Sequence, residues 1–149
     1  MMDAPAILVR SSFDLVTRAR AWTELDDGEL KRAAAKAANE RDAETLWSLT
    51  EAFIVVHGPA DANVSEQTLK TYKRGVLDLL GAWQGENLLR PRRDSGVMYV
   101  RGLEAQKKSS STVRVKLAAA QALYKALRWS GATSAVPFID AKPARDLSN

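Results

Sequence analysis

The segment from residue 109 to 131, SSSTVRVKLAAAQALYKALRWSG, constrains the fold more than any other part of the chain. It begins with hydroxyl-bearing residues and ends at a glycine, which are the usual signals for the start and end of a helix. Between these signals, apolar residues recur at steps of four and three, the spacing of one helix face: Val113, Leu117, Ala120, Tyr124 and Leu127. The segment therefore predicts a long helix that is buried along one side.

A second row of residues follows the same steps beside the apolar stripe. It consists of Arg114, Ala118, Gln121, Lys125 and Arg128. A cationic helix face often meets only solvent, and it sometimes meets a polyanion. The pattern alone leaves both interpretations open.

Four further helices are predicted over residues 27–41, 43–58, 66–83 and 95–106. Each follows a residue type that commonly caps a helix N-terminus: Asp26 or Asp27, Asp42, Ser65 and Asp94. The expected buried face of the second of these helices is Leu46, Leu49, Phe53 and Val56.

The two ends of the chain carry weaker patterns. Residues 1–26 show no sustained period and are interpreted as an N-terminal arm, whereas residues 132–149 read as an extended, proline-punctuated linker that trails away from the helical domain at 27–131. No stretch alternates as a strand does. The predicted fold class is all-α, a bundle of about five helices.

Composition excludes several classes of protein. The chain has 149 residues, enough for one domain with its own core, and 46% of them are hydrophobic, which argues against intrinsic disorder. Because it has no cysteine, disulfides, a thiol nucleophile and thiolate metal sites are excluded. Neither a secretory signal nor a membrane span is visible, so a cytoplasmic protein is expected.

Charge is distributed unevenly along the chain. Residues 1–64 contain 7 Lys or Arg against 11 Asp or Glu, whereas residues 65–149 contain 15 against 7. Such asymmetry favours an anionic partner for the second part, with nucleic acid as the first candidate. A lysine-rich solvated surface would give the same count.

Signals for catalysis are scarce. The single histidine, His57, falls in the last turn of a predicted helix, where a donor suits the free carbonyls better than it suits catalysis. Glycine-rich phosphate loops are missing, and neither a metal nor a cofactor is expected. A small helical enzyme that uses carboxylates would need a polar cleft, and no pattern in the sequence indicates one.

Signals for binding are concentrated at two helix starts. Hydroxyls and bases cluster between Ser65 and Arg74, and again between Lys107 and Lys116. Helix N-termini present free N–H groups and a partial positive charge, which suit phosphate oxygens. Capping alone explains one or two of the serines. It does not explain three serines and a threonine preceded by two lysines.

These two helices, in this order, resemble the N-terminal core-binding domain of tyrosine recombinases, the phage integrase family. The resemblance lies in SEQTLKTYKRGVLDLLGAW and in SSSTVRVKLAAAQALYKALRWSGATSAVPF, and it covers roughly residues 42 to 143. It implies an orthogonal, SAM-like helical bundle, here with an extra N-terminal helix. It also implies a protein of DNA recombination and integration.

In that family the helical domain places two helices in the major groove of a recombination half-site, and protomers can associate on the DNA. The resemblance therefore implies double-stranded DNA as partner and self-association of the full-length recombinase. The implied contacts are Thr68, Lys70, Thr71, Lys73, Arg74, Lys107, Lys108, Ser110, Ser111, Thr112, Arg114 and Gln121, with Lys142 and Arg145 on the linker.

The catalytic signature of the family does not occur in this sequence. No His-x-x-Arg is present, and Tyr72, Tyr99 and Tyr124 lie in helical patterns that suit a core better than a nucleophile. The chain is therefore expected to be the N-terminal domain without its catalytic domain and not to cut DNA alone. The alternative is a helical protein-interaction module whose basic face meets an acidic partner.

Overall fold

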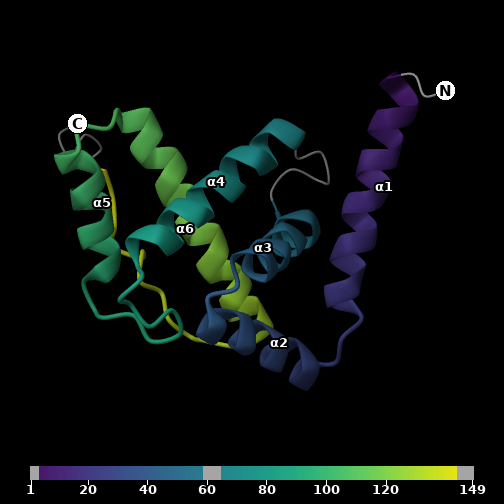
Figure 1. The fold of residues 1–149 in the computed structure, drawn as a ribbon, viewed down its shortest axis with the longest axis horizontal. Coiled ribbons are helices and arrows are strands. Elements are labelled where there is room, and N and C mark those ends of the chain that lie inside the picture. Colours follow the sequence, from purple (N-terminus) through teal and green to yellow (C-terminus); the bar gives the residue numbers. More distant parts are fainter. Residues whose placement is uncertain (1–3, 59–64, 144–149) are drawn as a thin grey trace.

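The computed structural model describes residues 4–58 and 65–143, with side chains from residue 14 onward. Within these ranges the chain is all-helical, which confirms the predicted fold class (Figure 1). The helices are α1 (Ala4–Thr23), α2 (Asp27–Glu40), α3 (Ala43–His57), α4 (Glu66–Ala82), α5 (Ser95–Ala105) and α6 (Ser110–Ser130).

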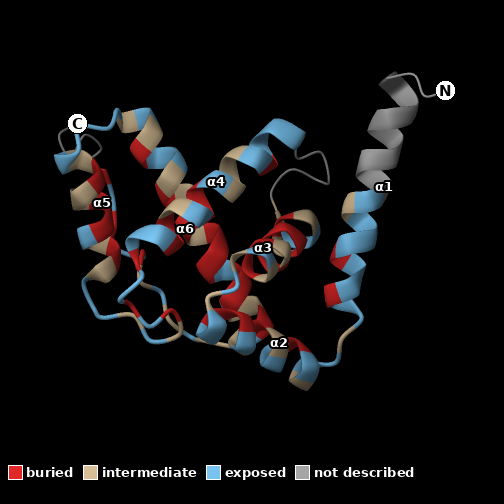
Figure 2. Ribbon diagram, viewed as in Figure 1, coloured by how far each residue is buried: buried red, intermediate tan, exposed pale blue. Residues whose placement is uncertain are grey.

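Helix α6 is the centre of the packing, since it contacts α2, α3, α4 and α5. Its predicted stripe is buried along its whole length, so that prediction is confirmed. Figure 2 shows the buried residues concentrated on α3 and α6. On α3, Leu46 and Leu49 are buried as expected, whereas Val56 is 44% exposed. That part of the predicted α3 face is wrong.

Local signals explain most helix ends. Asp26 forms a capping box with Glu29, and Asp42, Ser65 and Ser109 each accept a hydrogen bond from the backbone N–H three residues later. Helix α6 ends at Gly131 with a φ of 84°, the left-handed conformation that glycine adopts most easily. Asp94 holds the N-cap position of α5 as predicted, but its side chain makes no capping hydrogen bond.

Helices α4 and α6 cross at a point where both backbones come very close. A Cβ atom added to Gly75 would overlap the Cβ of Ala119, so only a glycine opposite a small residue fits this crossing. The crossing fixes how the first turns of the two helices lie relative to one another.

The N-terminal region is helical, which corrects its interpretation as an arm. The second half of α1 packs on α3 through the buried residues Ala19 and Trp22. Two polar contacts add to this packing. Arg18 Nε donates to Glu51 Oε1 at 2.9 Å, and Trp22 Nε1 donates to the hydroxyl of Ser48 at 2.9 Å.

The segment after α6 does not trail away from the domain as expected, because residues 132–143 pack back on it. Phe138 is only 3% exposed and stacks on Trp83, with ring centroids 5.3 Å apart. A Cβ at Gly96 would overlap the carbonyl of Pro137, so the segment also lies directly against α5. The linker expectation for these residues is therefore corrected.

Candidate nucleic-acid interface

The first halves of α4 and α6 diverge from the Gly75–Ala119 crossing and leave a groove between them. The groove has a volume of about 310 Å³ and is lined by Thr71, Arg74, Gly75, Ser111, Thr112, Val115 and Lys116. It therefore brings together residues from the two helix starts that the sequence singled out. In Figure 1 these starts lie at the same side of the molecule.

On α4 some of the candidate side chains are exposed, and others are already bonded to residues of the protein. Lys70 and Arg74 are exposed, whereas the ammonium of Lys73 lies 3.3 Å from Glu44 Oε1. The hydroxyl of Thr68 accepts from Ser65, and that of Thr71 donates to the carbonyl of Gln67 at 2.9 Å. Lys70 and Arg74 are thus the cations that α4 presents most openly.

At the start of α6, part of the serine cluster serves the helix itself. The hydroxyl of Ser109 accepts from the backbone N–H of Thr112 at 3.2 Å and donates to the Thr112 hydroxyl at 2.9 Å. Ser111 is exposed beside them, and Ser110 is half-buried. Capping therefore accounts for Ser109 and Thr112. The exposed Ser111 shares a hydrogen bond with Ser109, with their hydroxyl oxygens 3.2 Å apart.

Three exposed cations surround this helix start, namely Lys107, Lys108 and Arg114. Lys107 has a φ of 61°, so it turns the chain sharply from α5 into α6. This turn sets two lysines directly before the free N–H groups of α6, the combination that attracts an anion.

The cationic row along α6 does not form one continuous surface. Gln121, Lys125 and Arg128 line a second groove of about 300 Å³, which they share with Val136, Phe138 and Ile139 of the C-terminal segment. The guanidinium of Arg128 donates to the carbonyl of Ala135 at 2.9 Å, and its burial lowers the pKa of Arg128. Arg128 therefore holds the C-terminal segment, and Gln121 lies apart from the α4–α6 groove.

Two of the expected DNA contacts, Lys142 and Arg145, follow the last helix. Lys142 has an exposed side chain, and its backbone carbonyl accepts from Arg101 of α5 at 2.9 Å. Arg145 lies outside the described residues.

Lys116 belongs to the site although it is not among the implied contacts. It lines the α4–α6 groove and forms an ion pair with Asp78 of α4. Its place in the basic start of α6 was the signal in the sequence. The pairing with Asp78 could not be read there, because it depends on how the helices cross.

The loop after α4 carries further cations. Arg90 and Arg93 are exposed, whereas Arg92 donates to Glu86 Oε1 at 2.9 Å. Glu86 is buried, and its hydrogen bond from Arg92 holds the pKa of that carboxyl below its ordinary value. This pair fixes the loop beside α5.

The residues considered for catalysis serve packing. Tyr124 is buried and donates its hydroxyl to the carbonyl of Leu88 at 2.6 Å, Tyr99 is buried, and Tyr72 packs against the core. His57 packs its ring against Phe53 and Trp129, at centroid distances of 5.5 and 5.8 Å.

No group of three or more His, Asp or Glu residues within 4–58 and 65–143 could hold a metal ion. Among the described helices, none is long and apolar enough to cross a membrane.

Part of the chain matches a known protein family. The family model described as phage integrase, N-terminal SAM-like domain, matches residues 59–131, a shorter range than the residues 42 to 143 expected from the motifs. No curated protein and no solved structure matches the chain. The matched range includes α4, α5 and α6, and hence both sides of the groove.

Proposed function

We propose that the chain is a DNA-binding domain of a site-specific tyrosine recombinase, because residues 59–131 match the N-terminal SAM-like domain of phage integrase. It holds double-stranded DNA through the first halves of α4 and α6, which enter the major groove of a recombination half-site. It binds without cutting. Association of protomers on the DNA and a cytoplasmic location are parts of the same proposal.

One observation carries the proposal. The α4–α6 groove, within the matched range, is lined by Arg74, Lys116 and three hydroxyl-bearing residues of the two helix starts. Four further cations on or directly before the same two helix halves are exposed: Lys70, Lys107, Lys108 and Arg114. Free N–H groups, a positive dipole end and lysines together suit the phosphate backbone, and arginine suits base edges. Phosphate contacts give affinity and position, whereas base contacts give specificity.

We assign the proposed contacts accordingly. Lys70, Lys107 and Lys108 contact phosphates, and Arg74 of α4 and Arg114 of α6 reach base edges. The remaining proposed contacts are supporting ones: Thr68, Thr71, Lys73, Ser110, Ser111, Thr112, Gln121, Lys142 and Arg145.

The second candidate is a protein-interaction module, and a separate observation favours it. Ile139 is 71% exposed and lies with Val136 in the second groove, beside Lys125. An apolar pair next to a cation suits an acidic, partly apolar peptide. This surface lies apart from the α4–α6 groove, so the two candidates make different predictions.

The deciding experiment is a titration of random-sequence duplex DNA with the 149-residue chain at low and at near-physiological salt, read by fluorescence anisotropy. Binding should weaken steeply with salt, since each neutralised phosphate contributes about −0.9 to the log–log slope. Lys108→Ala should reduce that slope. Lys36→Ala is the matched control, because Lys36 is exposed on α2, outside the matched range. Absence of binding at low salt would put the protein-interaction module ahead.

A further inference from the structure

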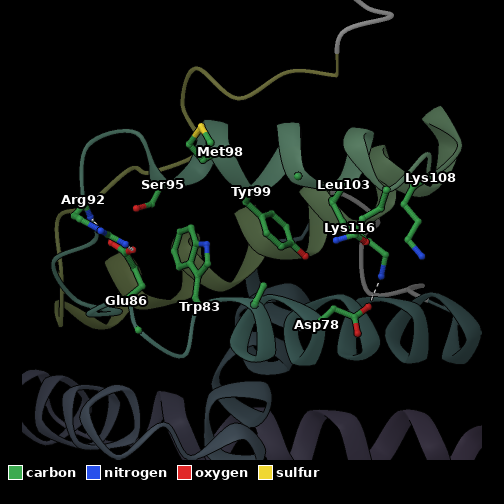
Figure 3. Close-up of a pocket in the computed structure, with 14 residues that line it drawn as sticks. Asp78, Trp83, Glu86, Arg92, Ser95, Met98, Tyr99, Leu103, Lys108 and Lys116 are labelled. Carbon is green, nitrogen blue, oxygen red and sulfur yellow. Dashed lines mark hydrogen bonds and ion pairs between the residues drawn. The ribbon is translucent and has the colours of Figure 1, made fainter.

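A third concave site lies on the other side of Lys116, between the end of α4, the following loop, α5 and the start of α6 (Figure 3). This cleft has a volume of about 510 Å³, which is within the range of sites for small organic ligands. The residues that matter for its chemistry are Asp78, Trp83, Met98, Tyr99, Lys108 and Lys116.

The hydroxyl of Tyr99 is the unusual feature of this cleft. Tyr99 is 8% exposed, and among the described residues its buried Oη has no hydrogen-bond partner. In Figure 3 the ring lies between Trp83 and Leu103, with its hydroxyl directed toward the side where Asp78 and Lys116 lie. The buried hydroxyl of Tyr124, by contrast, is bonded to Leu88. A buried polar group without a partner is costly and indicates a ligand contact or a functional role.

The charges of the lining favour an anion. Its two carboxylates are already paired, Asp78 with Lys116 and Glu86 with Arg92. Lys108 adds a third cation to the lining, so the balance is positive. A ligand that brings an oxyanion would complete this balance and also accept from the Tyr99 hydroxyl.

Apolar side chains line another part of the cleft. Met98 is 64% exposed at its edge, and Trp83 and Leu103 line its inner side. Methionine adapts its shape to different apolar groups, so this edge suits a short apolar body more than a bare ion.

We propose that this cleft binds a small amphiphilic anion. A carboxylate or phosphate oxygen of the ligand accepts from Tyr99 Oη and lies beside Lys108 and Lys116, and the apolar body of the ligand lies against Met98 and Trp83. Tyr99 can donate throughout the neutral range, because burial raises the pKa of Tyr99 to about 12. This proposal does not rest on the proposed DNA-binding function, although Lys116 lines both surfaces and Lys108 is also a proposed phosphate contact.

The test is an NMR titration of the ¹⁵N-labelled 149-residue chain at constant ionic strength. The probes are hexanoate, monobutyl phosphate, inorganic phosphate and, as the oppositely charged control, hexylammonium. Hexanoate or monobutyl phosphate should shift the indole signal of Trp83 and the amide signals of Gly102 and Gln106, which line the cleft. The two arms distinguish a carboxylate ligand from a phosphate ligand.

Two tyrosine variants decide the role of the hydroxyl. Tyr99→Phe should weaken binding of the amphiphilic anion at least fivefold and leave Tm unchanged or higher, because it removes a hydroxyl without a partner. Tyr124→Phe, the matched control, should lower Tm and leave the anion affinity unchanged.

Three results would overturn the proposal. The first is that no anion shifts the cleft signals, or that hexylammonium binds as well as hexanoate. The second is equal anion affinity in Tyr99→Phe and the parent. The third is a Tm of Tyr99→Phe several degrees below that of the parent, which would show that the hydroxyl has a protein partner such as Asp78.

Discussion

The two ends of α6 carry the same sequence pattern and have different surroundings. At the start, Arg114 is exposed beside a groove that opens between α4 and α6. About four helical turns later, Arg128 occupies the same row. Its guanidinium donates to the carbonyl of Ala135, in the C-terminal segment that lies over this end of α6. A periodic row of cations thus identifies a helix face. It does not say which part of that face stays open.

The largest expected effect comes from a substitution at the closed end of α6, the end that the C-terminal segment covers. Leu127 is fully buried there, so Leu127→Ala should lower the free energy of unfolding by about 2–5 kcal/mol. Urea unfolding followed by circular dichroism measures this change. Val115→Ala, on the open half and partly exposed, is the control and should cost less than about 0.5 kcal/mol. Equal losses for the two variants would contradict the difference between the ends.

The boundary between the two ends is the crossing at Gly75. Gly75→Ala places a methyl group against Ala119 and should lower the free energy of unfolding by about 1–3 kcal/mol. The double variant Gly75→Ala with Ala119→Gly should recover much of that loss, because it restores the space. Both are measured by urea unfolding. A loss that Ala119→Gly does not relieve would place the cause elsewhere.

The two arginines sharpen the comparison most directly. Arg128→Ala should lower the free energy of unfolding by about 1–2 kcal/mol, since it removes a charged hydrogen bond in a half-buried place. Arg114→Ala, at an exposed side chain, should cost less stability than Arg128→Ala and should weaken specific DNA binding by about 1–3 kcal/mol. Thermal unfolding and anisotropy titrations separate the two effects. The comparison fails if both variants change the same property.

The smallest expected effect is a pH dependence of the loop beside the closed end. The pKa of Glu86 is lowered mainly by its hydrogen bond from Arg92, so its stabilising contribution is fully present above the ordinary carboxyl pKa. That contribution is lost as pH falls below about 4.5 through the lower folded pKa. The loss should stay below about 1 kcal/mol, because the Arg92 side chain is mostly exposed.

Glu86→Gln checks this prediction, because the variant cannot titrate at that position. Urea midpoints measured between pH 6 and pH 3 should fall less steeply for Glu86→Gln than for the parent. Parallel curves would mean that Glu86 is not a source of the acid sensitivity.

Helices α2 to α6 could be predicted from the sequence because their signals are local. Asp26, Ser109 and Gly131 each act on residues within one turn, and the stripe of α6 is complete along its length. Helix α1 was missed because its described half buries only Ala19 and Trp22, too few residues to form a periodic stripe. The packing of Phe138 was missed because its partner, Trp83, lies far away in the sequence.

The candidate site was predictable only in part, for the same reason. Clusters of hydroxyls and bases located the starts of α4 and α6, and the structure joins those starts in one groove. The separation of Gln121 from Arg114 depends on residues 136–139, which cover one part of α6 and leave another open. The sequence around Gln121 gives no local signal that a distant segment packs beside it.

The close contact between Gly75 and Ala119 also acts as a fulcrum. Ser110 lies about nine residues from Ala119, or roughly 13 Å along a helix that rises 1.5 Å per residue. A change of about 10° in the crossing angle would therefore move the start of α6 by about 2 Å relative to α4. The missing side chain of Gly75, buried at the crossing, therefore controls the spacing between the exposed N-terminal ends of α4 and α6.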